Sequence, residues 1–588
     1  MKEQMTSQEE SFRTFRATLG RIVSDENNVI IGLSIIIGVS VGLGSLVFRF
    51  LLEGARTLLF EGLAGPEGTS TYFLVILIPA IGGLLVGPII HFFASEAKGH
   101  GVPEVMSAVA LRGGIIRRRV AMAKALASAI CIGSGGSAGR EGPIVQIGSA
   151  IGSGIGQFAR MSAQRLRILV GCGSAAGIAA VFNAPIAGVM FALEIILGDW
   201  GIRTLSPVVL SSVLASVTAR LAIGDKVAFR VPEYHLVSAW EIPIYSVLGI
   251  LAGIVAVLFI RSLYKWEDLF ESLKIPGYLK PAVGGLLVGA VGFFFPQIFS
   301  DGYPAVNEAL RGHLGLVLLL ALVLAKIGAT SFTLGSGNSG GIFAPSLFMG
   351  AMLGAAVGSI AHTFLPNLTA SEGAYALVGM AAVVGGTTHA PITAMLIIFE
   401  MTNDYSIILP VMLCTAVSTL VSSQMNRESI YTLKLARRGI NLKRGMEVNI
   451  MGSIAVETIM VKKVETVLAS QSLADFLKFL QQTTETSFPV VDDSGRLIGV
   501  LSLQDVREVL LNESRAGLEQ ILIAQDIADT DPATLHPGHT LNDAMMKFGK
   551  RDSDRLPVVN PDTRELLGIV KRSDVINAYN RALLSAGR

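Results

Sequence analysis

Nine apolar stretches of bilayer-spanning length constrain this chain more than any other feature. A helix of roughly 20 apolar residues crosses the hydrocarbon core of a bilayer. Stretches of about this length recur over residues 28–53, 72–94, 168–197, 244–259, 281–299, 314–332, 342–364, 375–401 and 407–423. A soluble protein would have to bury all of them in its core. We therefore expect a polytopic, all-α membrane protein.

Charge is sparse and concentrated outside these stretches. The chain is 51% hydrophobic and 16% charged, and its net charge of +2 gives no indication of a nucleic-acid partner. Residues 1–27 are polar and charged, unlike a signal peptide, and are expected to form a cytoplasmic N-terminal segment. Basic clusters at 112–119, 160–167 and 434–444 flank the apolar stretches. By the positive-inside rule, both termini are predicted to be cytoplasmic.

The composition changes near Thr432, where a basic segment replaces the apolar stretches. We predict a transmembrane domain over 28–431, a basic linker over 432–451 and a soluble domain over 452–588. The soluble part repeats a pattern: Phe488-Pro-Val-Val and Asp505 in one unit match Leu556-Pro-Val-Val and Asp574 in the next. Each unit is predicted to contain a helix, two short strands joined by a turn, and a closing helix.

The apolar region also contains an internal repeat. Residues 133–143 read GSGGSAGREGP and residues 335–345 read GSGNSGGIFAP, so that six of eleven positions agree at an offset of 335 − 133 = 202. The same offset relates Lys124 to Lys326, each the single lysine of an apolar stretch. Duplicated halves with Gly/Pro-interrupted segments are typical of transporters that bind substrate between the two copies. We favour an inverted repeat.

Both glycine-rich loops have the chemistry of an anion site. Each ends in a proline and continues into an apolar stretch, so each is expected to present the N-terminus of a helix, with unpaired N–H groups and a positive dipole end. Such an end favours an anion. Lys124 and Lys326 would raise the local potential. Alternatively, the glycines only allow close helix packing.

One carboxylate interrupts this pattern. Glu141 stands at the end of the first loop, and the matching position in the second copy is the apolar Phe343. An ionised Glu141 would occupy the place of the anion and would leave it on protonation, which predicts a gate. The alternative is a carboxylate that only complements the dipole of its helix.

These motifs resemble the CLC chloride channel and transporter family along nearly the whole chain. The matching segments are 139–143 (GREGP), 340–345 (GGIFAP), 182–185 (FNAP) and Ile430-Tyr431. The resemblance implies a homodimer with one pore per subunit and Glu141 as the gating residue. It also implies that anions contact Gly139, Arg140 and Gly142 in the first loop, the backbone amides of Ile342 and Phe343, and the hydroxyl of Tyr431.

Two residues depart from the pattern of the family. His100, in the segment Gly99-His-Gly-Val-Pro103, stands where the family commonly has a serine at the central anion site. It would either donate an N–H to the anion or bond to the loop backbone. Proton-coupled members commonly carry a glutamate directly after the residue that matches Glu194, and here that residue is Ile195.

The C-terminal domain resembles a tandem pair of CBS domains, which commonly bind adenine nucleotides such as ATP, ADP or AMP. Ser502 and Asp505 match the signature for ribose and phosphate, and Asp574 is the acid of the second unit. Lys571 stands where that second unit commonly has Ser or Thr. The alternative is a purely structural module.

The sequence thus predicts a chloride-selective channel in a cell membrane, with no required cofactor, no metal site and no enzymatic activity. A chloride/proton antiporter is the nearest alternative, and a fluoride exchanger is a variant of it. A divalent-cation transporter is disfavoured because the apolar stretches contain few carboxylates.

Overall fold

The structure is a computed structural model that describes residues 26–62, 74–224, 229, 237–402, 406–440, 442–443, 447–448, 451, 454–511, 521–550 and 553–586. Nearly all of the predicted N-terminal segment 1–27 lies outside these residues. The described residues divide into two compact units, one running to Arg438 and one beginning at Val448, and the short segment 439–447 is shared between them. This division falls within the segment 432–451, for which the sequence predicts a linker.

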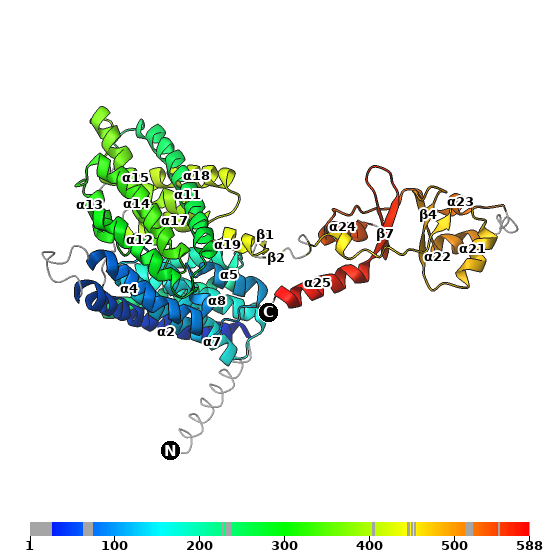
Figure 1. Ribbon diagram of the computed structural model, residues 1–588, viewed down its shortest axis with the longest axis horizontal. Helices are drawn as coiled ribbons and strands as arrows, with labels where there is room; N and C mark the ends of the chain where they lie inside the picture. Colours follow the sequence, from blue (N-terminus) through cyan, green and yellow to red (C-terminus); the bar gives the residue numbers. More distant parts are fainter. Residues whose placement is uncertain are drawn as a thin grey trace, which may run out of the picture. The chain divides into compact units, whose positions relative to one another are not determined.

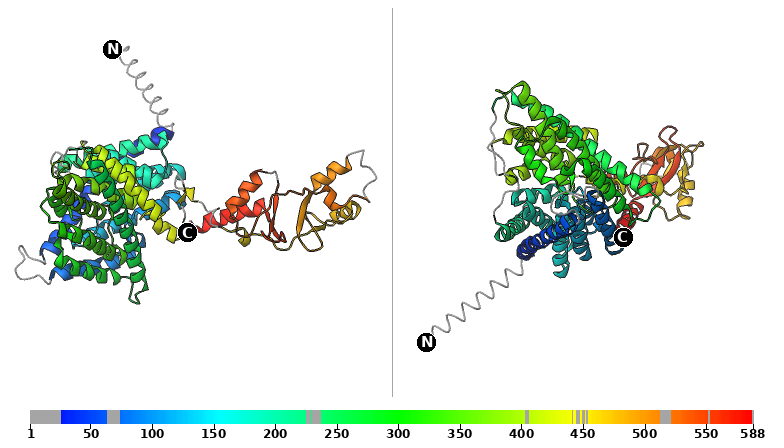
Figure 2. Two further views of the ribbon diagram at one scale, coloured as in Figure 1. Left: turned by 90° about the horizontal axis from the view of Figure 1, so that it is seen from above. Right: turned by 60° about the vertical axis from the view of Figure 1, so that its left-hand side comes forward.

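Two successive sets of helices build the first unit. Figure 1 and the right-hand view of Figure 2 show the first set (blue to cyan) beside the second (green to yellow). The first set comprises α2 (Glu26–Ala55), η1 (Arg56–Glu61), α4 (Leu74–Pro88), η2 (Ile89–Phe93), η3 (Ser95–Ala97), α5 (Val102–Leu111), α6 (Arg119–Gly133), α7 (Glu141–Phe158), α8 (Ala163–Phe182), α9 (Pro185–Phe191), η4 (Ala192–Leu197) and α10 (Ile202–Ile223).

The second set repeats this order. It comprises α11 (Glu241–Ser272), α12 (Lys280–Phe294), η5 (Pro296–Ile298), α13 (Tyr303–Leu310), α14 (Leu316–Gly335), α15 (Phe343–Phe364), α16 (Glu372–Thr388), α17 (Pro391–Thr402) and α18 (Ile408–Met425), and α19 (Thr432–Arg437) follows. Helix for helix, α2 corresponds to α11, α4 to α12, and so on to α10 and α18. Among the described helices, eight are long and apolar enough to cross a membrane.

The apolar stretches do not all form single helices. The stretches 168–197 and 375–401 are each broken in the middle, at Asn183 and His389, which adopt left-handed conformations with φ of 57° and 55°. An Ala-Pro pair follows each of them, and proline can begin a new helix but cannot continue the old one. The sequence prediction also missed α10, although its mean hydropathy of 1.6 is no lower than the 1.5 of α8 and α18. Several hydroxyls of α10 bond to backbone, as Ser212 does to the carbonyl of Pro185 at 2.7 Å.

Glycine pairs let the longest buried helices cross closely. A Cβ atom on Gly148 of α7 would overlap the carbonyl oxygen of Gly173 on α8, and a Cβ atom on Gly173 would overlap that of Gly148. Gly350 on α15 and Gly379 on α16 form the same reciprocal contact in the second set. Helices in a membrane associate through this kind of small-residue packing.

This packing predicts different outcomes for two glycines of one helix. Gly148→Ala should destabilise the protein by about 1–3 kcal/mol, because its methyl group would force α7 and α8 apart. Gly154→Ala on the same helix should be neutral or slightly stabilising, because the nearest atom to its Cβ lies 3.8 Å away and alanine favours helix. Thermal inactivation followed by size-exclusion chromatography in detergent compares them. Equal midpoints would contradict the packing argument.

The second unit contains two similar α/β modules, as the sequence predicts. The first has β3 (Val467–Leu468), α21 (Leu473–Leu480), β4 (Ser487–Val491), β5 (Leu497–Ser502), α22 (Leu503–Leu510) and α23 (Ala524–Ile527). The other has α24 (Leu541–Lys550), β6 (Arg555–Val559), β7 (Leu566–Lys571) and α25 (Arg572–Ala586), and η6 (Val456–Thr458) packs into its core through Val456. Near the linker, β1 (Leu442–Lys443) pairs with β2 (Glu447–Val448).

The two modules share strand register as well as order. β4 pairs antiparallel with β5, and Phe488 lies opposite Leu501. β6 pairs with β7 in the same way, and Leu556 lies opposite Val570. Each pair shifts register between the two valines of its Pro-Val-Val motif. The inward side chains of each hairpin join a small apolar core of their own module.

Candidate functional site

The two glycine-rich loops meet each other in the middle of the first unit. The N–H of Gly139 donates to the carbonyl of Gly341 at 2.8 Å, and the N–H of Gly341 donates to the carbonyl of Gly139 at 2.6 Å. These glycines are duplicates of each other, because 341 − 139 = 202. Two duplicates that pair antiparallel with each other are related by a local two-fold axis that passes between them. Such an axis is the relation expected of an inverted repeat.

This pairing brings two helix N-termini together. α7 begins at Glu141 and α15 at Phe343, each two residues after its paired glycine. The approach requires glycine, since a Cβ on Gly341 would lie 2.7 Å from the backbone nitrogen of Gly142. The first N–H groups of both helices have no partner within their own helix and point to the junction. The junction is therefore a positive site made mainly of backbone.

Glu141 lies at the junction and is 1% exposed. Its Oε1 accepts a hydrogen bond from the hydroxyl of Tyr303 at 3.1 Å, and its Oε2 accepts one from the backbone N–H of Ala344 at 3.4 Å. Both donors belong to the second set of helices. The carboxylate thus contacts the group of N–H donors that an anion would use.

The sequence prediction missed Tyr303, although the repeat contains the signal. Residues 300–304 read SDGYP and residues 99–103 read GHGVP, which align at an offset of 201. Extending the repeat by this segment places Tyr303 opposite Val102 and Asp301 opposite His100. The two loops before α5 and α13 are therefore also duplicates.

Lys124 and Lys326 anchor these loops. Both are fully buried. The ammonium of Lys124 donates to the carbonyls of Ala97 and Gly99 at 3.0 and 2.6 Å. That of Lys326 donates to the duplicates of these groups, the carbonyls of Ile298 and Ser300, at 2.9 and 3.0 Å. Each lysine thus brings a positive charge near the junction and also fixes the loop that carries His100 or Tyr303.

His100 lies between Gly99 and Gly101, whose φ angles of 72° and 81° favour glycine. The residue is 2% exposed. Neither ring nitrogen forms a hydrogen bond with any described residue. The hydrogen bond to loop backbone that a purely structural role requires is therefore not formed there. The ring instead faces that of Tyr431, with centroids 5.7 Å apart.

The remaining predicted anion contacts surround the junction. Ile342 precedes α15, and Phe343 is its first residue, with a ring centroid 5.8 Å from that of Phe182. The guanidinium of Arg140 lies over the ring of Tyr303 at 5.4 Å. The structure therefore brings Gly139, Arg140, Glu141, Gly142, Ile342 and Phe343 together, and places His100 and Tyr431 beside each other.

Two more carboxylates, one in each copy, accept hydrogen bonds from the other copy. Glu194 of η4 accepts hydrogen bonds from the N–H and hydroxyl of Thr393 at the start of α17, at 2.8 and 2.6 Å. Its duplicate Glu400 accepts from the N–H of Ala187 near the start of α9 at 2.6 Å. Each acid thus caps a helix of the other copy. Sequence spacing gives no signal for this exchange.

In the second unit, Ser502 and Asp505 bond to each other. The hydroxyl of Ser502 donates to Asp505 at 2.6 Å, and the N–H of Asp505 donates to the Ser502 hydroxyl at 3.3 Å, which forms a capping box on α22. Lys571 forms an ion pair of 3.2 Å with Glu485. Asp574 lies in the first turn of α25. Burial lowers the pKa of Arg555, and the nearby carboxylates of Glu465 and Asp574 oppose that shift.

The fold defines an integral membrane protein whose two duplicated halves meet at a junction of helix N-termini. The sequence model described as voltage gated chloride channel matches residues 82–423, and the CBS domain model matches residues 456–512 and 524–581. The chain therefore belongs to the voltage-gated chloride channel (CLC) family of anion transporters, and it carries tandem CBS domains.

Named relatives include both channels and exchangers. A putative ClcB-like chloride channel protein of Ralstonia nicotianae is 34% identical over 68% of this chain and 95% of its own length. The H(+)/Cl(-) exchange transporter ClcA of Vibrio cholerae is 31% identical over 70% of this chain and 90% of its own. The crystal structure of a slow cyanobacterial Cl-/H+ antiporter matches with a TM-score of 0.64 at 27% identity, over 70% of this chain and 97% of the other.

The hydrogen bond from Tyr303 to Glu141 predicts that anion flux increases when this bond is removed. Tyr303→Phe removes one of the donors that hold Glu141 at the junction. Because a hydrogen bond to a charged group contributes about 1.5–3 kcal/mol, we expect anion flux to rise by about tenfold or more. Flux is measured with purified protein in liposomes.

Tyr375→Phe is the matched control. Its hydroxyl also donates to a buried carboxylate, that of Glu241, at 3.1 Å. This variant should lose comparable stability but keep the wild-type flux. Equal fluxes for Tyr303→Phe and the wild type would show that Tyr303 does not hold the gate.

Proposed function

We propose that this chain is a chloride-selective channel gated by the carboxylate of Glu141. The observation that carries this proposal is the contact of Glu141 with the N-terminus of α15, where Ala344 donates to Oε2 at 3.4 Å. An ionised Glu141 competes with an anion for these donors. Protonation removes the charge of Glu141 and weakens its interaction with these donors. The site is then free for the anion.

The remaining residues supply donors and charge along the path. Gly139, Arg140, Gly142, Ile342 and Phe343 surround the gate with backbone N–H groups and one guanidinium. His100 and Tyr431 form a second position, where a ring N–H and a hydroxyl contact the anion. The unpartnered nitrogens of His100 support this role, because buried polar atoms are otherwise almost always bonded.

Passive conduction is favoured over proton exchange by the surroundings of η4. Ile195, which stands where proton-coupled members commonly have an acid, is apolar and only 5% exposed. Glu194, beside it, is held by hydrogen bonds to the start of α17. A carboxylate fixed in this way is a poor proton carrier. The alternative, a chloride/proton antiporter, draws support from the likeness to the two exchangers.

A reversal-potential measurement separates these two mechanisms. The full-length protein is reconstituted in liposomes or a planar bilayer with equal chloride and a pH gradient. A channel should reverse at zero, and with a tenfold chloride gradient it should reverse at about 59 mV, the potential for one charge. A reversal potential that follows pH at equal chloride would establish exchange. In the same preparation, competition by fluoride tests for a fluoride exchanger, and flux of divalent cations tests for a cation transporter.

The pH dependence of flux in the variant Glu141→Gln is measured in the same preparation. The neutral amide cannot compete as an anion, so its flux should be high and independent of pH, whereas that of the wild type should rise on acidification. Glu308→Gln on α13 is the control, because its carboxylate is half exposed and pairs with Arg311 at 3.3 Å. A pH dependence that survives in Glu141→Gln would remove Glu141 from the gate.

We also propose that the protein is a homodimer with one pore per subunit and cytoplasmic termini, and that its first CBS module binds an adenine nucleotide at Ser502 and Asp505. Asp574 is the corresponding acid of the second module. There Lys571 is engaged by Glu485, so nucleotide binding is expected to depend mainly on the first module.

Two aspartates with similar serine contacts separate binding from stability. Asp505 and Asp475 each form a cap with a serine three residues earlier. Changing either to alanine should cost about 0.5–2 kcal/mol of stability. Only Asp505→Ala should lose binding of ATP, ADP or AMP, measured by calorimetry on the full-length protein. Unchanged binding by Asp505→Ala would favour a purely structural module.

A further inference from the structure

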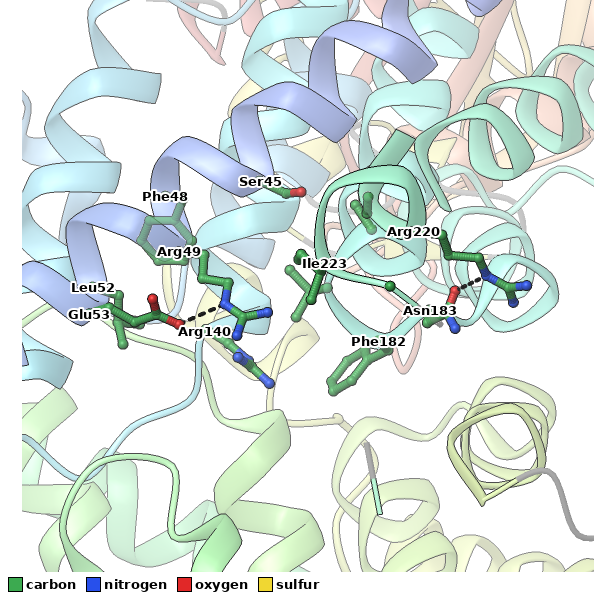
Figure 3. A pocket seen from close by; sticks show the side chains of 14 residues that line it. Ser45, Phe48, Arg49, Leu52, Glu53, Arg140, Phe182, Asn183, Arg220 and Ile223 are labelled. Atoms are coloured by element: carbon green, nitrogen blue, oxygen red, sulfur yellow. Dashed lines mark hydrogen bonds and ion pairs between the residues drawn. The ribbon is translucent and has the colours of Figure 1, made fainter. Parts of the chain in front are cut away.

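A cavity lined by three arginines opens beside the gate (Figure 3). It encloses about 240 Å³ between the second half of α2, the ends of α8 and α10, and the loop before α7. Since a water molecule occupies about 30 Å³ in the liquid, the cavity holds an ion together with several waters. The polar side chains that line it are Ser45, Arg49, Glu53, Arg140, Asn183 and Arg220.

Arginines outnumber carboxylates in the lining of this cavity. The lining has three arginines and one carboxylate, Glu53, which pairs with Arg49 at 2.7 Å. The carboxylates of Glu141 and Asp301 act on Arg140 from outside the lining. Arg220 bonds to the side-chain oxygen of Asn183 and also interacts with Glu400. Figure 3 shows the guanidinium groups of Arg49 and Arg140 on one side of the cavity, and Arg220 on the other side with its guanidinium directed to the side chain of Asn183. Arg49 and Arg140, which share one side of the cavity, repel each other unless an anion lies between them.

Favourable interaction with the dipoles of the surrounding helices does not explain the positions of all three arginines. Arg220 lies in the last turn of α10, where a cation complements the helix C-terminus. Arg49 lies six residues before the end of α2, since 55 − 49 = 6. Arg140 directly precedes α7, and a helix N-terminus disfavours a cation. Its buried Nε has no hydrogen-bond partner among the described residues.

Arg140 connects the cavity to the gate. It directly precedes Glu141, and its guanidinium lies over the ring of Tyr303. The hydroxyl of that tyrosine donates to Glu141. An anion that binds Arg140 from the cavity therefore lies one residue from the carboxylate that it must displace.

We propose that this cavity is an accessory anion-binding site, formed by Arg49, Arg140 and Arg220, which holds a partly hydrated small anion before it passes Glu141. The inference rests on the proposed anion conduction and adds a second site to it. The side chains of Arg49 and Glu53 are about half exposed, so the site binds weakly, and its contribution falls as ionic strength rises. It raises the local concentration of anions rather than selecting among them.

Concentration dependence of chloride flux tests the site. The full-length protein is reconstituted in liposomes of neutral phosphatidylcholine, so that no anionic headgroup competes for the arginines. Arg49→Gln and Arg220→Gln should each raise the half-saturating chloride concentration by about threefold, and the double variant by about tenfold, because each removes one charge near the anion. The maximal flux at high chloride should stay within about twofold of the wild type, because high salt screens these charges.

Two controls make the test specific. Arg203→Gln removes an exposed arginine from the other end of α10, roughly 26 Å away at 1.5 Å per residue, and should leave the half-saturating concentration unchanged. Arg49→Gln combined with Glu53→Gln removes the ion pair without changing the net charge, and should restore much of the wild-type value. Arg49→Lys, which keeps the charge, should behave as wild type.

The outcomes separate this inference from the proposed function. If the wild type carries chloride but the double variant keeps its half-saturating concentration, the accessory site is wrong and conduction stands. If Arg49→Gln with Glu53→Gln is as impaired as Arg49→Gln alone, a local structural role replaces the electrostatic one. A wild type that carries no anion would overturn the proposed conduction itself.

Discussion

The pairing of Gly139 with Gly341 is the constraint on which the rest of the membrane unit depends. Two backbone hydrogen bonds join each glycine to its own duplicate. This geometry fixes where both following helices begin, and it brings two positive helix ends to one place. A side chain at Gly341 or Gly142 would separate the loops. The proposed anion site is thus a product of backbone geometry, to which side chains add control.

The buried lysines extend this constraint to the neighbouring loops. A lysine ammonium inside a membrane protein is costly unless its charge is solvated by the protein. Lys124 and Lys326 meet that requirement with two loop carbonyls each. The bonds hold the loops that carry His100 and Tyr303 against the junction. The lysines are therefore structural and electrostatic at once, whereas their sequence positions indicated only the charge.

Local patterns predicted the duplicated loops, Glu141, the lysines and the β-hairpins of the CBS modules, because each is written in adjacent residues or a fixed offset. Contacts between distant segments were not predictable in this way. Glu194 and Glu400 cap helices about 200 residues away, and only the fold brings α2 and α10 beside Arg140. α10 was also missed, although its mean hydropathy of 1.6 is no lower than that of α8 and α18.

The two copies differ at four positions close to where they meet. Glu141 corresponds to Phe343, Arg140 to Ile342, His100 to Asp301 and Val102 to Tyr303. All four differences lie in the loops that surround the junction, whereas the glycine pairs, the lysines and the crossing carboxylates that build the scaffold are kept in both copies. A symmetric scaffold offers two equivalent ends to an anion. The substitutions make the ends unequal: one copy supplies the carboxylate, and the other supplies the hydroxyl and the N–H that hold it. The proposed gate depends on this inequality, because a carboxylate in each copy would leave neither with a full set of donors.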